Sequence, residues 1–175
     1  MSEKSGKPKP VHGINLGSKK LKLFFITHLN RIYFAKAHLV TRLPQLVKEV
    51  HFADLEQAIR ETVGDVEKQM ARMELIYELL DAQITKGSIH GLTGLVDDAF
   101  EAIREQAGES ELRDLSILFY MQNIESVEMA SFQVLQMAAV KLKNKHIKQL
   151  LTENYDEAKS DRTLLLLIAA KYITK

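Results

Sequence analysis

Four acidic residues in the second half of the chain have the spacing of paired ligands on helices. Glu125 and Glu128 are three residues apart, and Glu157 and Asp161 are four apart. Either spacing puts both carboxylates of a pair on one face of a helix, where their oxygens would suit iron or manganese. The chain contains no Cys, which excludes disulfides, thiol nucleophiles and iron–sulfur clusters. Any metal or catalytic chemistry must therefore use oxygen or imidazole groups.

These acids interrupt the apolar stripes of two predicted helices, which lie over 110–142 and 147–172. The polar residues at stripe positions are Gln122, Glu125, Glu128, Asn154, Glu157 and Asp161. A buried carboxylate without a partner is costly, so it either takes up a proton or recruits a cation. The pattern therefore predicts positive charge between these two helices and the rest of the core.

The first helix offers such a charge, because Lys36 lies in the middle of an otherwise apolar stripe between Ile32 and Leu39. Three interpretations remain open at this point. The acids and Lys36 form an internal ion-pair network, the acids hold a metal ion, or all of them are ordinary surface residues.

Composition narrows the class of protein. The chain has 175 residues, 46% of them apolar, and a net charge of +1, which fits one domain and gives no reason to expect nucleic acid as a partner. The longest apolar stretch covers 164–170, far less than the roughly 20 residues that span a bilayer, and no secretory signal is evident. We expect no membrane partner and a cytoplasmic location.

The pattern along the chain predicts an all-α fold. A basic arm rich in Gly, Ser and Pro covers 1–20, and a single helical domain covers 21–175. Helices are expected over 21–50, from Asp54, over 92–106, 110–142 and 147–172, with Asp54 and Ser110 as N-caps. Two long hairpins joined by a short crossover helix are the wiring of a ferritin-like four-helix bundle.

Four segments also carry a resemblance to a known family. They are YFAKAHL, RLPQLV, ELRDLSILFYMQNIESVEMASF and LLTENYDEAKSD. Together they resemble the YciF/YciE group of bacterial stress-associated proteins, the domain of unknown function 892, in the ferritin-like and rubrerythrin-like class, and the similarity extends from Lys22 to Tyr172. The resemblance implies a homodimer with a di-metal centre. Its ligands would be a Glu from the first helix, a Glu-x-x-His pair from the second and acids from the last two.

The acidic positions of the second half match that pattern at Glu125, Glu128, Glu157 and Asp161. The first helix departs from it, because the family motif Tyr-x-Ala-Glu ends here in Lys36. An ammonium cannot bind a metal while it is charged. We therefore interpret Lys36 as an internal counter-ion in a vestigial or altered metal site.

The second helix departs as well. In place of Glu-x-x-His the chain has GDVE, so that Gly64 replaces the Glu and Glu67 replaces the His. None of the six histidines follows a Glu at the required spacing. The first two helices thus contribute at most Glu67 to a metal site.

Two functions follow from these readings, and whether the chain is an enzyme stays open. The first is a non-catalytic, stress-associated bundle with a degenerate di-metal site, no cofactor and a protein partner that the sequence does not name. The alternative is a non-haem iron or manganese oxidoreductase, rubrerythrin-like or catalase-like, with an altered carboxylate-rich site. Elemental analysis distinguishes the two.

Overall fold

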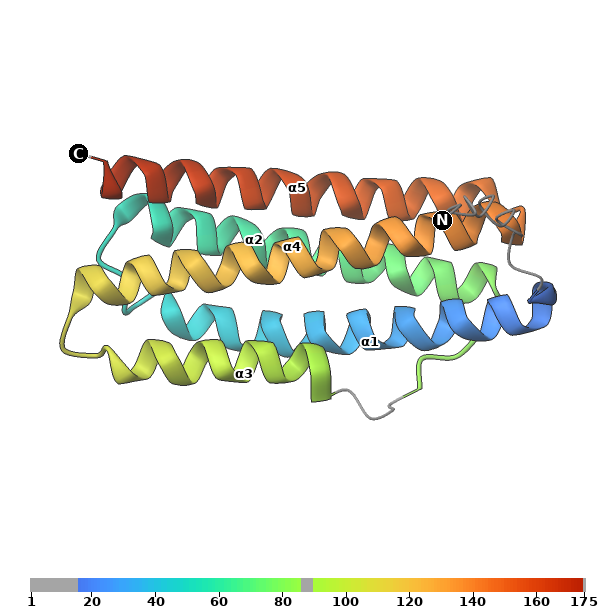
Figure 1. The fold of residues 1–175 in the computed structure, drawn as a ribbon, viewed down its shortest axis with the longest axis horizontal. Helices are drawn as coiled ribbons and strands as arrows, with labels where there is room; N and C mark the ends of the chain where they lie inside the picture. The colour runs from blue at the N-terminus through green and yellow to red at the C-terminus, as the bar shows by residue number, and fades with distance from the viewer. Residues whose placement is uncertain (1–15, 86–89, 175) are drawn as a thin grey trace, which may run out of the picture.

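The computed structural model describes residues 16–85 and 90–174, and the described chain consists of four long helices and a short one (Figure 1). The long helices are α1 (Gly17–Leu46), α2 (Ala53–Leu79), α4 (Ser110–Leu142) and α5 (Lys145–Ile173), and the short helix is α3 (His90–Glu105). At 1.5 Å per residue the long helices extend about 40–50 Å. None of them, within the described ranges, is long and apolar enough to cross a membrane.

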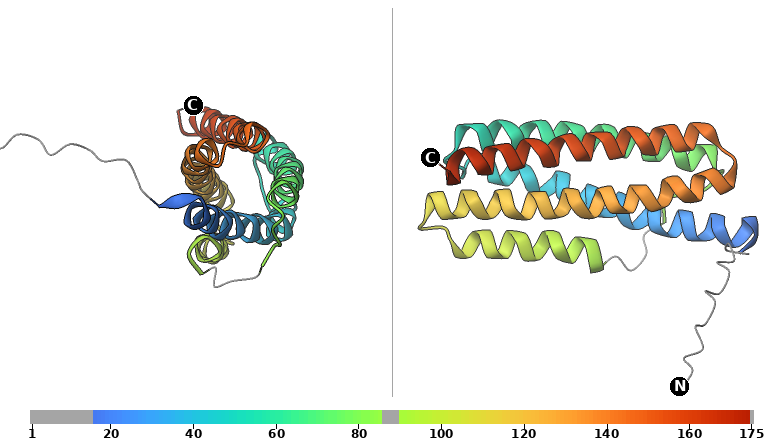
Figure 2. Two further views of the ribbon diagram at one scale, coloured as in Figure 1. Left: turned by 90° about the vertical axis from the view of Figure 1, so that its right-hand side faces the viewer. Right: turned by 45° about the horizontal axis from the view of Figure 1, so that its top comes forward.

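The four long helices form a ring in the order α1, α2, α5, α4 when viewed along their axes (Figure 2). Each is antiparallel to both of its neighbours, so the diagonal helices α2 and α4 run in the same direction (Figure 1). A chain that joins two parallel helices must return along the bundle, and the segment that contains α3 does so. This is the wiring of ferritin-like bundles, and the predicted fold class is confirmed.

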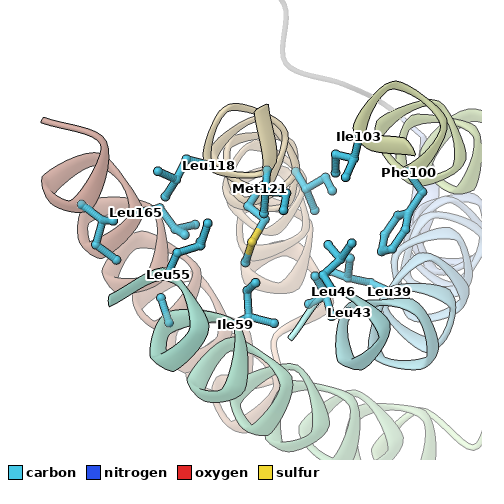
Figure 3. Close-up of a cluster of buried hydrophobic side chains, with 14 of the residues drawn as sticks. Leu39, Leu43, Leu46, Leu55, Ile59, Phe100, Ile103, Leu118, Met121 and Leu165 are labelled. Carbon is cyan, nitrogen blue, oxygen red and sulfur yellow. The ribbon is translucent and has the colours of Figure 1, made fainter. Parts of the chain in front are cut away.

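Helix α3 lies outside the ring, against α1 and α4. Its Phe100 and Ile103 point between those helices toward Leu39, Leu43 and Met121 (Figure 3). Because α3 has 16 residues and α1 has 30, it covers only part of the groove between α1 and α4.

The helix ends differ in detail from the prediction. Asp54 lies inside the first turn of α2, and the N-cap residue is Phe52, whose side chain makes no capping hydrogen bond. The cap comes instead from α4, where the buried Asp114 accepts hydrogen bonds from the backbone N–H groups of His51 and Phe52, both 2.6 Å long. A carboxylate at a helix N-terminus satisfies free donors and matches the helix dipole.

The other helix boundaries lie close to the predicted ones. Ser110 is the first residue of α4 and Glu109 is its N-cap, whereas α5 is capped by the side chain of Asn144. The arm predicted over 1–20 lies outside the described residues up to residue 15. Residues 17–20 already belong to α1, so the helical domain begins before residue 21.

The core is divided along the bundle axis into two apolar clusters. One contains Leu39 and Leu43 of α1 together with Val66 and Leu165, and it includes the α3 side chains (Figure 3). The other surrounds Phe25 and the first half of α1. Buried polar side chains occupy the level between them.

Candidate functional site

The ammonium group at the centre of the bundle belongs to Lys36, which is completely buried. It follows Ile32 of one apolar cluster and precedes Leu39 of the other on the inner face of α1. The Nζ atom donates hydrogen bonds to Oε2 of Glu128 and to Oε1 of Gln69, and it lies 5.5 Å from the centre of the Phe132 ring. Lys36 thereby connects α1 with α2 and α4.

Helix α4 contributes two buried carboxyl groups one turn apart. Glu128 forms the ion pair with Lys36, and Glu125 lies next to that pair with 2% of its surface exposed. Burial, followed by the charge of Glu128, raises the pKa of Glu125 well above its ordinary value, although Lys36 acts in the opposite direction. The raised pKa favours the protonated form of Glu125, and the positive charge of Lys36 balances the charge of Glu128.

Helix α5 contributes Asp161, which is 5% exposed and precedes Leu165 of the core. Burial, followed by the negative charge of Asp65 on α2, raises the pKa of Asp161 to about 7. Its Oδ2 atom, like Oε2 of Glu125 and Nε2 of Gln69, has no hydrogen-bond partner among the described residues. The side chains of the centre thus satisfy only part of one another's hydrogen-bonding capacity. Unpaired buried polar atoms of this kind are costly.

Glu157, also on α5, is turned away from this centre. Both of its carboxylate oxygens accept hydrogen bonds from Arg72 on α2, each 2.7 Å long, and about a quarter of its side chain is exposed. Arg72 also contacts Glu153 at 3.1 Å and Asn154 at 3.3 Å. Glu157 therefore belongs to a half-buried ion-pair group between α2 and α5 rather than to the Lys36 cluster.

Glu67 is a second predicted site residue that lies outside the Lys36 cluster, because it is exposed to solvent. Its neighbour two positions earlier, Asp65, interacts electrostatically with Asp161 and Glu125. Residues two positions apart lie on different faces of a helix, whereas Asp65 and Gln69 share one face. The contribution of α2 to the centre is thus Gln69 and Asp65, and the expectation for Glu67 is corrected.

Comparisons with known proteins agree with this architecture. The model of the domain of unknown function DUF892 matches residues 20–175. The chain belongs to this family. It is 26% identical to the protein YciF of Escherichia coli over 161 residues, which are 91% of this chain and 96% of that protein.

Three solved structures share the fold. The crystal structure of the E. coli stress protein YciF matches with a TM-score of 0.83 and 25% identity, covering 89% of this chain and 98% of that one. YcfI of Rhodopseudomonas palustris, provisionally described as a structural protein, matches with a TM-score of 0.79 and 24% identity, covering 87% of this chain and 97% of that one. A protein of Xanthomonas campestris matches with a TM-score of 0.68 and 14% identity, covering 88% of this chain and 94% of that one.

The donor set of this DUF892 chain does not fit the di-metal centre that the resemblance implies. In the described part of the chain, no three His, Asp or Glu side chains are grouped as metal ligands would be. Oε2 of Glu128 accepts a hydrogen bond from the Lys36 ammonium, and the α2 side chain that accepts from the same ammonium is an amide, Gln69. The Lys36 ammonium offsets the charge of Glu128, which reduces the negative charge available to attract a divalent ion.

Two polar residues of the centre, Asp65 and Gln69, were not identified from sequence, and neither was Arg72 at its edge. Gln69 had a usable signal, because it lies three residues after Val66 and four before Met73 on the buried stripe of α2. Arg72 is one turn further along and has no signal except its charge, since its partner Glu157 is 85 residues away.

Proposed function

We propose that this protein is a stress-associated, ferritin-like bundle without catalytic activity, in which the Lys36 ammonium takes the place of metal ions at the centre. The observation that carries the proposal is the buried ion pair between Lys36 and Glu128, with Gln69 as a second acceptor. A fixed positive charge among the acids opposes the binding of another cation nearby.

The charge state of the other acids supports the same reading. Without a bound metal, the raised pKa values of Glu125 and Asp161 favour the protonated forms of these groups. The centre can thus be nearly neutral without any bound ion. Its role is then structural, holding α1, α2 and α4 in one register, and the biological role is exercised through the surface.

The relatives support the stress-related and structural parts of the proposal by their descriptions, a stress protein in E. coli and a provisionally structural protein in R. palustris. A homodimer is part of the proposal as well. Exposed apolar side chains on the second half of α5, Leu166, Leu167 and Ile173, support association, since such groups mark contact surfaces. A cytoplasmic location and the lack of a nucleic-acid partner stay predictions from composition.

Light scattering of the purified full chain tests the oligomeric state. We expect twice the mass of one chain, 19.9 kDa, and a Leu167→Asp variant should dissociate more readily because its charge would be desolvated in the contact. A parent that scatters as a single chain at all concentrations contradicts the dimer and leaves the proposal for the centre unaffected.

Elemental analysis tests the centre itself. The protein is produced in medium supplemented with iron and manganese, purified without chelators and compared with Glu125→Gln and Glu67→Gln variants. We expect metal far below one ion per chain in all three. The exposed Glu67 serves as the matched control, because it has the same chemistry outside the cluster.

Near-stoichiometric iron or manganese in the parent that disappears in Glu125→Gln and persists in Glu67→Gln would overturn the proposal. The oxidoreductase alternative would then apply, with Glu125, Glu128 and Asp161 as oxygen ligands. Purified metal-loaded protein would next be tested for turnover of peroxide.

A further inference from the structure

The groove between α1 and α4 continues beyond the start of α3, and no other described residue covers it there. It has a volume of about 730 Å³ and is bordered by Gly91 and Leu92 at the α3 end. Volumes of roughly 300–1,000 Å³ are typical of sites for small ligands. In the neighbouring part of the groove α3 fills the equivalent space with its own side chains, such as the buried Val96 and Phe100.

The walls of the open part are mostly apolar. The lining side chains from α1 and α4 that are apolar and larger than alanine are Phe24, Ile32, Val127, Val134 and Leu135. Phe24 and Val134 are 38% and 50% exposed, so the apolar surface of the groove is not fully covered. An occupant that buries these side chains would gain from the removal of apolar area from water.

One cationic side chain, Arg31, lines the groove. Arg31 lines it next to the start of α3 and forms no ion pair or hydrogen bond within the described residues. The first turn of α3 carries no acidic residue, so no acidic side chain of that turn neutralises the positive end of the helix dipole. His28 lies one turn away from Arg31 toward the apolar end of the groove. The centre of its ring is 4.4 Å from the centre of the Phe24 ring.

We propose that this groove binds a free long-chain fatty acid, with the carboxylate at Arg31 and the start of α3 and the acyl chain along Phe24 and Val134. The combination of one cationic end and one apolar end matches a ligand that is charged at one end only. A guanidinium and a helix N-terminus both recognise carboxylates. The site is separate from the Lys36 centre, so this proposal does not depend on the proposed function.

Fluorescence titration tests the proposal with cis-parinaric acid as the probe and the full chain in dilute buffer. The probe should gain fluorescence on binding with one site per chain. Palmitate should displace it, and hexadecanol, which has the same chain length without the charge, should displace it more weakly.

Two variants and a matched control locate the site. Arg31→Gln should weaken palmitate binding about fivefold and leave hexadecanol binding nearly unchanged. Ala130→Trp, at an exposed α4 position that lines the groove, should abolish probe binding by filling the space. Ala53→Trp fills the second groove, between α2 and α5, and should bind the probe as the parent does.

Equal probe affinity in Ala130→Trp and the parent would overturn the proposal, as would an Arg31→Gln variant that binds palmitate and hexadecanol as the parent does. Light scattering of the same samples tests whether a second copy of the protein occupies the groove instead. If the parent binds no probe and Ala130→Trp converts a dimer into single chains, a second copy of the protein covers this groove and no fatty-acid site exists.

Discussion

Replacing Lys36 by methionine tests whether the central cation compensates the buried acids. The Lys36 side chain is completely buried, and Glu128, with which it forms an ion pair, is 4% exposed. Methionine is unbranched, flexible and apolar, so the substitution removes the charge while leaving little empty space. The Glu128 carboxylate then lacks its only ion-pair partner among the described residues.

The size of the effect follows from what Glu128 must do next. A glutamate in an unfolded chain titrates near about pH 4.3, so keeping one protonated at about pH 7 costs about 3.7 kcal/mol. Removing one partner of a buried ion pair costs about 3–5 kcal/mol in other proteins. We therefore expect the free energy of unfolding to fall by about 3–4 kcal/mol at neutral pH.

The same reasoning gives the pH dependence of the loss. At about pH 5 the protonation costs only about 1 kcal/mol, because the unfolded chain also begins to take up the proton. Urea unfolding followed by far-UV circular dichroism at the two pH values measures both quantities. The difference between variant and parent should shrink as the pH falls.

Two further variants keep the test decisive. The double variant Lys36→Met with Glu128→Gln removes both charges and should recover much of the lost stability. Lys68→Met removes an exposed lysine that pairs with Asp65 and should change stability little. A Lys36→Met protein as stable as the parent at neutral pH, or a loss that does not change with pH, would refute the reasoning.

Three other perturbations probe the surrounding charges. Because the pKa of Asp161 is raised to about 7, the folded chain binds more protons than the unfolded chain between about pH 4 and pH 7, and the parent loses stability as the pH rises through this window. Asp161→Asn should reduce that slope and be favoured relative to the parent above about pH 7, as measured by urea unfolding. Asp114→Ala should cost about 1–3 kcal/mol, because it removes the acceptor for the N–H of Phe52 at the start of α2. Arg72→Gln should cost at most about 1 kcal/mol, because its pair with Glu157 is partly exposed, and the loss should shrink in high salt.

Opposite results would each contradict one element of the site. An unchanged pH slope in Asp161→Asn would mean that Asp161 is not the group that takes up the proton. No loss in Asp114→Ala would mean that water caps α2 equally well. A loss in Arg72→Gln that is large and independent of salt would place the Arg72 pair in the buried centre rather than at its edge.

The apolar stripes were sufficient to predict the fold and the inward position of several polar residues. Lys36 is flanked by Ile32 and Leu39, and the acids of α4 and α5 are likewise flanked by core residues on the same helix. Such flanking residues fix the helical phase, because a helix that buries its apolar side chains must bury what lies between them on that stripe. The ferritin-like wiring followed from the short helix between two long hairpins.

The expectation for Glu67 failed because it came from a short motif instead of from the stripe. Within α2 the buried Val66 and Met73 place Gln69 inside and Glu67 outside. Glu157 lies at the edge of its apolar stripe, where its carboxylate accepts a hydrogen bond from the partly exposed Arg72. The position of Glu157 depends on a contact between two helices, which the period of a single helix does not contain.

The position of the polar level explains why a bundle would retain it at some cost in stability. With two apolar clusters alone, a helix could shift by a turn and still bury leucines against leucines. Lys36 has acceptors on both α2 and α4, so such a shift would move its charge into an apolar cluster and leave Glu128 unpaired, at a cost of several kcal/mol. The ion pair thus selects one register among several that hydrophobic burial would accept. The double variant that removes both charges should therefore lose its unique packing more readily than its stability. That outcome would distinguish an ion pair that fixes the helix register from one that only stabilises the fold.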